Sequence, residues 1–158
     1  MTTAIATLRK PFWDSSYSQQ FEVRTYSVEQ AEAQSIVLDW MSLLNNAAIQ
    51  LQNECAEDGW DGYTALPISI EALTYASSLI SLLPFNIAQP DVVPEPRGDI
   101  GLEWRSGDTK IMTLCVSEGR FVYAAILGKN HKLHGEEPFS SHELPMQVKN
   151  ILFSHFER

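Results

Sequence analysis

The hydrophobic period of this chain changes once, at residue 99, and that change constrains the fold more than any other feature. From 99 to 127, apolar and polar residues alternate in three runs, DIGLEWRS, KIMTLCVS and RFVYAAIL. A period of two is typical of strands that bury one face. Gly107–Asp108 and Glu118–Gly119 separate the runs and favour tight turns. We predict a three-stranded antiparallel meander, which HKLHG extends as a short fourth strand, so that the sheet spans residues 99–135.

Before this meander the apolar residues recur with helical spacing. Ser27 and Gln30 match a capping box, and one apolar stripe continues from there to Cys55. Ser69 begins a second stripe, which Pro84 ends. The two stripes predict an N-terminal helical hairpin over residues 27–84, joined by a loop of about ten residues.

Three further segments complete the expected architecture. Residues 1–26 form an aromatic N-terminal arm, which we expect to pack on the body or on a second subunit. The Pro-rich residues 85–98 are expected to be an extended connector, because each proline fixes φ and removes a donor. Ser140-x-x-Glu143 resembles a second capping box and predicts a C-terminal helix within residues 140–158, packed on one sheet face. The class is α+β, as a single domain of residues 1–158.

The charge balance limits the partners of the chain. Against 11 Lys+Arg stand 20 Asp+Glu, a formal net charge of -9. Nonspecific nucleic-acid binding is disfavoured, because it requires Lys and Arg to displace counterions. An acidic surface fits plain solubility, a basic protein partner, or mimicry of a nucleic acid.

The compartment follows from what the sequence lacks. We find no signal peptide at the start and no run of apolar residues long enough to span a membrane. Cys55 and Cys115 lie far apart and form no C-x-x-C pair, so both are expected to be reduced core residues. The predicted localisation is cytoplasmic, with no membrane partner.

Two clusters hold candidate binding residues. In Trp60-Asp61-x-Tyr63, a carboxylate near two aromatic rings can act as a general acid. Alternatively, Trp60 and Tyr63 anchor the turn between the helices while Asp61 caps it. Glu103 and Arg105 lie on the sheet face opposite Trp104, where Glu103 is either a docking charge or half of a cross-strand pair.

Two histidines are the candidate metal ligands. His131-x-x-His134 precedes two glutamates, and such side chains bind zinc. Residues three apart in a strand point to opposite faces, which favours surface histidines instead. The chain also has no G-x-S-x-G, P-loop or dinucleotide-binding glycine pattern, so we expect no cofactor and lean against an enzyme.

The same sheet face as Glu103 is unusually apolar for a solvated surface. Its predicted residues are Ile111, Cys115, Val122, Ala124 and Ile126. Either the N-terminal arm or a partner is expected to cover this patch.

One resemblance rests on three motifs: GWDGYTALPIS from Gly59, the LLP that ends at Pro84, and VVPEPRGDIGLEW up to Trp104. Together they resemble a family of small bacterial proteins of unknown activity, encoded in variable regions rich in mobile elements. The likeness covers roughly residues 58 to 126. It departs from the family at Arg97, where an acidic residue is expected before the glycine. The resemblance implies a bacterial, cytoplasmic accessory protein, for which antitoxin, immunity or defence roles are common.

These observations lead to one principal hypothesis and two alternatives. The first is a non-enzymatic protein–protein interaction module, antitoxin-like or inhibitor-like, and a homodimer. The second is a small enzyme or ligand-binding protein with a pocket near Asp61, Tyr63 and Glu103. The third is an acidic nucleic-acid mimic.

Overall fold

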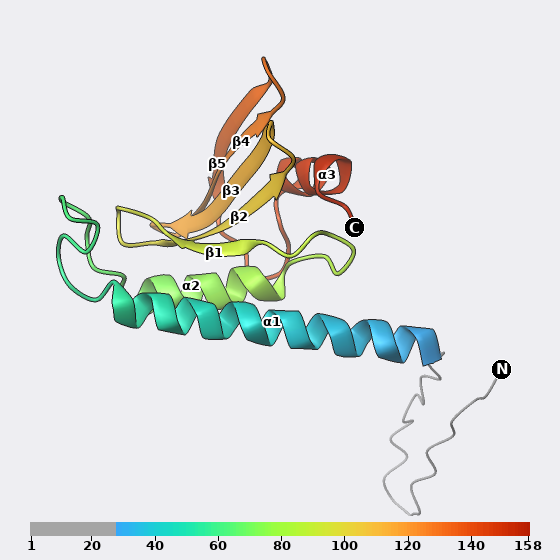
Figure 1. The fold of residues 1–158 in the computed structure, drawn as a ribbon, viewed down its shortest axis with the longest axis horizontal. Helices are drawn as coiled ribbons and strands as arrows, with labels where there is room; N and C mark the ends of the chain where they lie inside the picture. Colours follow the sequence, from blue (N-terminus) through green and yellow to red (C-terminus); the bar gives the residue numbers. More distant parts are fainter. Residues whose placement is uncertain (1–27) are drawn as a thin grey trace, which may run out of the picture. The chain divides into compact units, whose positions relative to one another are not determined.

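A computed structural model describes the backbone from residue 28 onward and the side chains from residue 39. The predicted aromatic arm and the capping box at Ser27 therefore lie outside the described residues. The core belongs to a compact unit of residues Asp39–Arg158. In chain order the elements are α1 Val28–Glu54, α2 Ile70–Ser81, β1 Asp91–Pro94, β2 Ile100–Ser106, β3 Lys110–Ser117, β4 Arg120–Leu127, β5 Lys132–Pro138 and α3 Met146–His155 (Figure 1).

The strands form one antiparallel sheet in the order β1-β2-β3-β4-β5, so each strand pairs with its neighbour in sequence. The predicted α+β class is confirmed, but the predicted count of three to four strands is too low. The missed strand, β1, lies inside the Pro-rich connector, where Val92 pairs with Leu102. An edge strand tolerates a proline such as Pro94, because one side of its backbone needs no ladder partner. The last strand, β5, also runs further than the predicted HKLHG, as far as Pro138.

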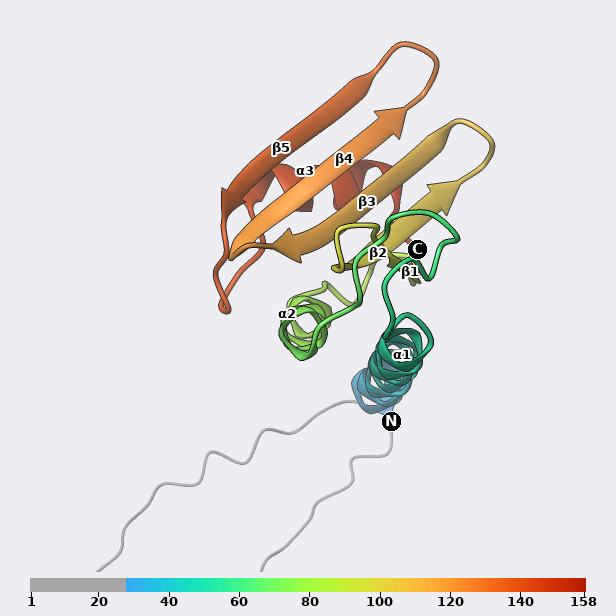
Figure 2. The same ribbon diagram turned by 90° about the vertical axis from the view of Figure 1, so that its left-hand side faces the viewer.

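One face of the sheet carries the core. The alternating residues that the sequence pattern placed together are buried on it: Ile100, Leu102, Trp104, Met112, Leu114, Val116, Phe121, Tyr123, Ala125 and Leu127. Figure 2 shows α3 behind the sheet, on one side of it. The indole N–H of Trp104 donates to the carbonyl of Ala88 (2.9 Å), which fixes the segment before β1 against the sheet.

The second helix begins where its cap predicts. The Ser69 hydroxyl accepts from the backbone N–H of Ala72 (3.0 Å), which satisfies one of the free donors at the start of α2. Ala72 and Ala76 share a buried cluster with Ala48 and Cys55, at the end of α1 and just after it. The connector 55–69 is longer than expected, because α1 ends at Glu54 and α2 begins at Ile70.

The third helix begins later than the predicted capping box. Met146 is its first residue, and Pro145 precedes it without a side-chain cap. The hydroxyl of Ser140 instead accepts from the backbone N–H of His142 (3.2 Å). The physical reason is Pro145, which disfavours helical geometry at the residue before it. The residues that follow α3 return to the segment before β1: Ala88 N–H donates to the Phe156 carbonyl, and Arg158 N–H donates to the Asn86 carbonyl.

Candidate functional site

The connector between α1 and α2 is held by its own polar groups. The Asp61 carboxylate accepts from the backbone N–H groups of Tyr63 (2.8 Å) and Ala65 (3.2 Å). The indole N–H of Trp60 donates to the carbonyl of Leu66 (2.9 Å). Asp61 thus shapes a turn, as aspartates often do. We expected Trp60 and Tyr63 to anchor the turn. Trp60 does pack against the buried cluster of Ala48, Cys55, Ala72 and Ala76, but Tyr63 is 85% exposed and does not anchor the turn.

The connector also contacts the turn between β1 and β2. Leu66 N–H donates to the carbonyl of Pro96 (2.9 Å). Gly98 has a φ of +85°, and a Cβ there would lie only 2.6 Å from the Pro67 carbonyl oxygen. Two of the motifs that carry the family resemblance, the GWDGY run and the P-x-P-x-G run, therefore lie against each other.

Glu103 and Arg105 form an ion pair along β2, with 2.6 Å between Glu103 Oε1 and an Arg105 guanidinium nitrogen. The partner of Glu103 is thus in its own strand and not across the sheet. The three cavities that we describe in residues 39–158 are lined by neither Asp61, Tyr63 nor Glu103.

The outer face of the sheet has an apolar centre. It is the face opposite the core, and we call it the open face. Among the described residues it consists of Asp91, Val93, Gly101, Glu103, Arg105, Ile111, Thr113, Cys115, Ser117, Arg120, Val122, Ala124, Ile126, Lys132, His134, Glu136 and Pro138. Ile126 remains 41% exposed, and Ala124 is exposed as well. These are the residues whose alternation predicted an unusually apolar outer face.

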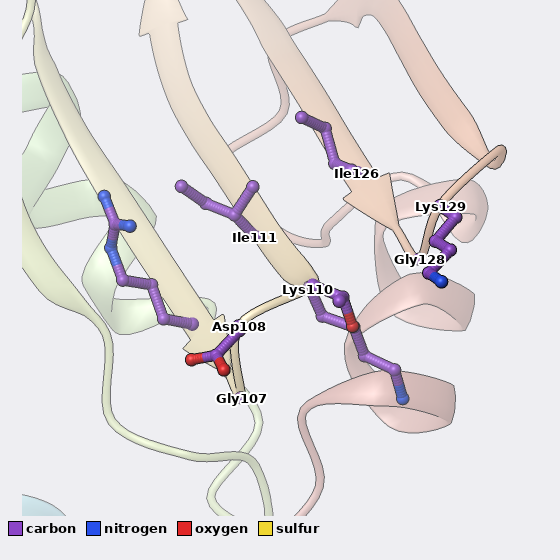
Figure 3. Close-up of a pocket in the computed structure, with 9 residues that line it drawn as sticks. Gly107, Asp108, Lys110, Ile111, Ile126, Gly128 and Lys129 are labelled. Carbon is purple, nitrogen blue, oxygen red and sulfur yellow. The ribbon is translucent and has the colours of Figure 1, made fainter.

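Two open cavities lie on this face. The larger, of about 660 Å³, lies between the β2–β3 and β4–β5 loops, and the smaller, of about 400 Å³, extends toward His134. Both are lined by Ile111 and Ile126. Figure 3 shows these two side chains projecting in the same direction from neighbouring strands, while Lys110 points away from them. The two cavities therefore meet at this pair of isoleucines, and the rest of the larger cavity is lined by charged, polar and glycine residues.

The two ends of the open face carry opposite charge. At the end with the β2–β3 and β4–β5 loops, which we call the loop end, Arg105, Lys110, Lys129 and Lys132 stand against one acidic residue, Asp108. At the other end, the turn end, lie Glu95, Asp99, Glu118 and Glu136 with two arginines. Sequence reasoning missed this division in an acidic chain. The sequence does contain this information, since Arg105 and Lys110 lie within three residues of Gly107, and Lys129 follows Gly128.

Glu95 lies where the negative charge accumulates. The Glu95 carboxylate lies over Gly101 of β2: a Cβ built on Gly101 would be only 2.8 Å from the carboxylate oxygen. Burial raises the pKa of Glu95, and the nearby charges of Asp99 and Glu103 raise it further. Burial, together with Glu95 and Asp99, also raises the pKa of the Cys115 thiol to about 12. A thiol with such a pKa is a poor nucleophile near neutral pH.

The histidines lie apart from any grouping suited to a metal. His131 is exposed beside the β4–β5 loop, and its carbonyl accepts from Leu127 N–H. His134 is exposed on the open face, opposite Ala124. Within the part of the chain that the structure describes, no three His, Cys, Asp or Glu side chains are arranged to hold a metal ion. Cys55 and Cys115 are both buried and unbonded.

Comparison with protein-family models, with curated proteins and with solved structures finds no match. The family resemblance therefore stays a prediction from the sequence. None of the helices in the described residues has the length and apolar character needed to cross a membrane.

Proposed function

We propose that this chain is a non-enzymatic protein-interaction module that binds a partner protein through the open face of its sheet. The observation that supports this most is the hollow around Ile111 and Ile126, where the described residues leave Ile126 41% exposed and Ile111 half-buried. Apolar surface of this kind is stabilised when another protein removes it from water. An antitoxin-like or inhibitor-like role fits such a module, because both act by covering a surface of the partner.

The groups that an enzyme would use are engaged elsewhere. The Asp61 carboxylate accepts two backbone N–H groups, and Glu103 is paired with Arg105. The raised pKa of Cys115 keeps its thiol protonated. These observations support association over chemistry as the activity of the described residues.

The test is the substitution Ala124→Arg, which places a long charged side chain in the middle of the open face. Met146→Arg is the matched control, because Met146 is an exposed apolar residue on α3. Tagged full-length protein is incubated with a lysate of the organism that encodes it. We expect wild type and Met146→Arg to retain the same protein, an untagged copy of the chain included, and Ala124→Arg to lose it.

Circular dichroism and thermal unfolding show whether Ala124→Arg keeps its fold. If the folded Ala124→Arg variant retains the same protein as wild type, the open face is not the binding surface. If wild type retains nothing at stoichiometric amounts, the proposed function is wrong.

A further inference from the structure

We propose that the partner on the open face is a second copy of this chain, packed face to face with its strands antiparallel to those of the first. This inference rests on the proposed function and names its partner. Two sheets pack face to face with their strand directions within about 30° of each other, either parallel or antiparallel. The charges and shapes along each strand decide which orientation is favourable.

The register of the sheet defines three rows across the open face. Toward the loop end, Arg105 pairs with Ile111, Ile111 with Ile126, and Ile126 with Lys132. The middle row contains Asp91, Glu103, Thr113, Ala124 and His134. Toward the turn end the row contains Gly101, Cys115, Val122 and Glu136.

A two-fold axis along the middle row exchanges the two outer rows and keeps each strand opposite its own copy. Lys132 then lies over the partner's Glu136, and Arg105 lies over the partner's Gly101, which the carboxylate of the partner's Glu95 covers. Both contacts bring opposite charges together, and the symmetry forms each of them twice. A parallel arrangement, with a two-fold axis along the strands, would instead reverse the strand order and place loop end over loop end, so that Lys132 would lie far from the partner's Glu136.

The apolar side chains fit the same orientation. The large Ile111 and Ile126 lie in one outer row, and the smaller Cys115 and Val122 lie in the other. The axis therefore packs each isoleucine against a smaller side chain of the partner. In the parallel arrangement, isoleucine would meet isoleucine at one end and leave a gap at the other, which lowers complementarity.

Charged side chains at both ends of the open face are available to form ion pairs with a partner. Neither Lys129 nor Lys132 has an ion-pair partner within residues 39–158, and neither do Glu95 and Asp99. The carboxylate of Glu95 lies near the negative charges of Asp99 and Glu103. A positively charged arginine of a second copy would therefore stabilise its ionised form. The bond between Arg120 and Glu136 is long, at 3.4 Å, and both side chains remain open to a further contact.

The size of the face sets the expected affinity. Five strands about 4.8 Å apart, with about seven residues at about 3.3 Å each, cover roughly 550 Å² of flat area. Stable interfaces bury about 800 Å² of accessible surface per partner. We therefore expect a weak dimer, with a dissociation constant in the micromolar range.

The experiment is a charge exchange between Lys132 and Glu136, measured by sedimentation velocity over a concentration series of the full chain. Lys132→Glu places glutamate over the partner's Glu136, and Glu136→Lys places lysine over the partner's Lys132. We expect each single variant to dimerise at least tenfold more weakly than wild type. An equimolar mixture of the two variants should form a heterodimer within about threefold of the wild-type affinity, because both pairs are then opposite in charge. Arg158→Glu and Asp58→Lys are the matched controls, since both residues are exposed outside the open face and should leave the dimer unchanged.

Each outcome decides the question. The inference is overturned if wild type is monomeric at millimolar concentration, if both single variants dimerise like wild type, or if the mixture recovers no association. Failure of the inference is distinct from failure of the proposed function. A monomeric wild type that still captures another protein, and loses it on Ala124→Arg, keeps the function with a different partner.

Discussion

Gly98 shows how one residue joins two parts of the fold. Its positive φ favours glycine, and its hydrogen atom faces the Pro67 carbonyl where the connector meets the β1–β2 turn. We expect Gly98→Ala to lower the free energy of unfolding by roughly 2 kcal/mol or more, because the Cβ adds a backbone clash to the strain of the left-handed conformation. Urea unfolding followed by circular dichroism measures this loss.

Gly62 provides the matched control for that substitution. Its φ of +82° is nearly the same, but a Cβ there would meet nothing within 4 Å. Gly62→Ala should therefore lose only the conformational part, about 1 kcal/mol. Equal losses at the two positions would show that the contact with Pro67 contributes nothing to stability.

Side-chain type alone predicted some residue roles and misled on others. Asp61 was expected to cap a turn because aspartate accepts from the backbone N–H groups that follow it, and it does so. Tyr63 was expected to anchor the turn together with Trp60, yet its side chain is exposed. Side-chain type does not reveal the direction that a turn gives each side chain, nor the bond from Leu66 N–H to the distant Pro96 carbonyl that holds this connector.

At the scale of the element, the two serine caps make a direct comparison. Ser69 caps α2 through its hydroxyl, whereas Ser140 lies outside α3. We expect Ser69→Ala to cost about 1 kcal/mol of stability, as the loss of an N-cap usually does. Ser140→Ala should change stability by less than about 0.5 kcal/mol, as most exposed substitutions do. Thermal unfolding of both variants tests the pair, and a larger loss at Ser140 would contradict the observed start of α3.

The sequence pattern predicted the elements well where one period held and poorly where proline interrupted it. The strands β2, β3 and β4 match their alternating runs because one face is buried throughout. The strand β1 was missed because its four residues end in Pro94 and include little alternation. The segment before it is also held by the hydrogen bond from the Trp104 indole to the Ala88 carbonyl, a contact between distant residues that no local pattern reveals.

At the scale of the whole molecule, the two cysteines are probes of two different regions, the helical cluster and the sheet. Cys55 lies in the cluster that joins the helices to Ile100 of β2, and Cys115 lies within the sheet. Both are buried, and burial raises the pKa of each thiol. We expect neither to react with iodoacetamide in the native state at pH 8. In a urea series both should become reactive at the same midpoint, because a single compact unit of this size usually unfolds cooperatively.

Mass spectrometry of the two cysteine peptides measures that result separately for each site. Labelling of Cys55 at a lower urea concentration than Cys115 would show that the helices open while the sheet remains folded. The raised pKa of the Cys115 thiol also predicts how the stability of the fold changes with pH. The folded thiol of Cys115 has the higher pKa, so its contribution to stability is present below pH 9.0 and is lost as the pH rises toward 12.

The agreement between strand order and chain order has a consequence for the speed of folding. Each hairpin of the sheet closes a short loop, so the strands can add one after another with little loss of chain entropy at each step. The contact between the segment before β1 and the residues after α3 is different, since its side-chain bond from Asn86 to Glu157 joins residues 71 apart. Loop entropy makes that closure less costly once the strands between have paired. It is the step that converts a row of hairpins into a closed core.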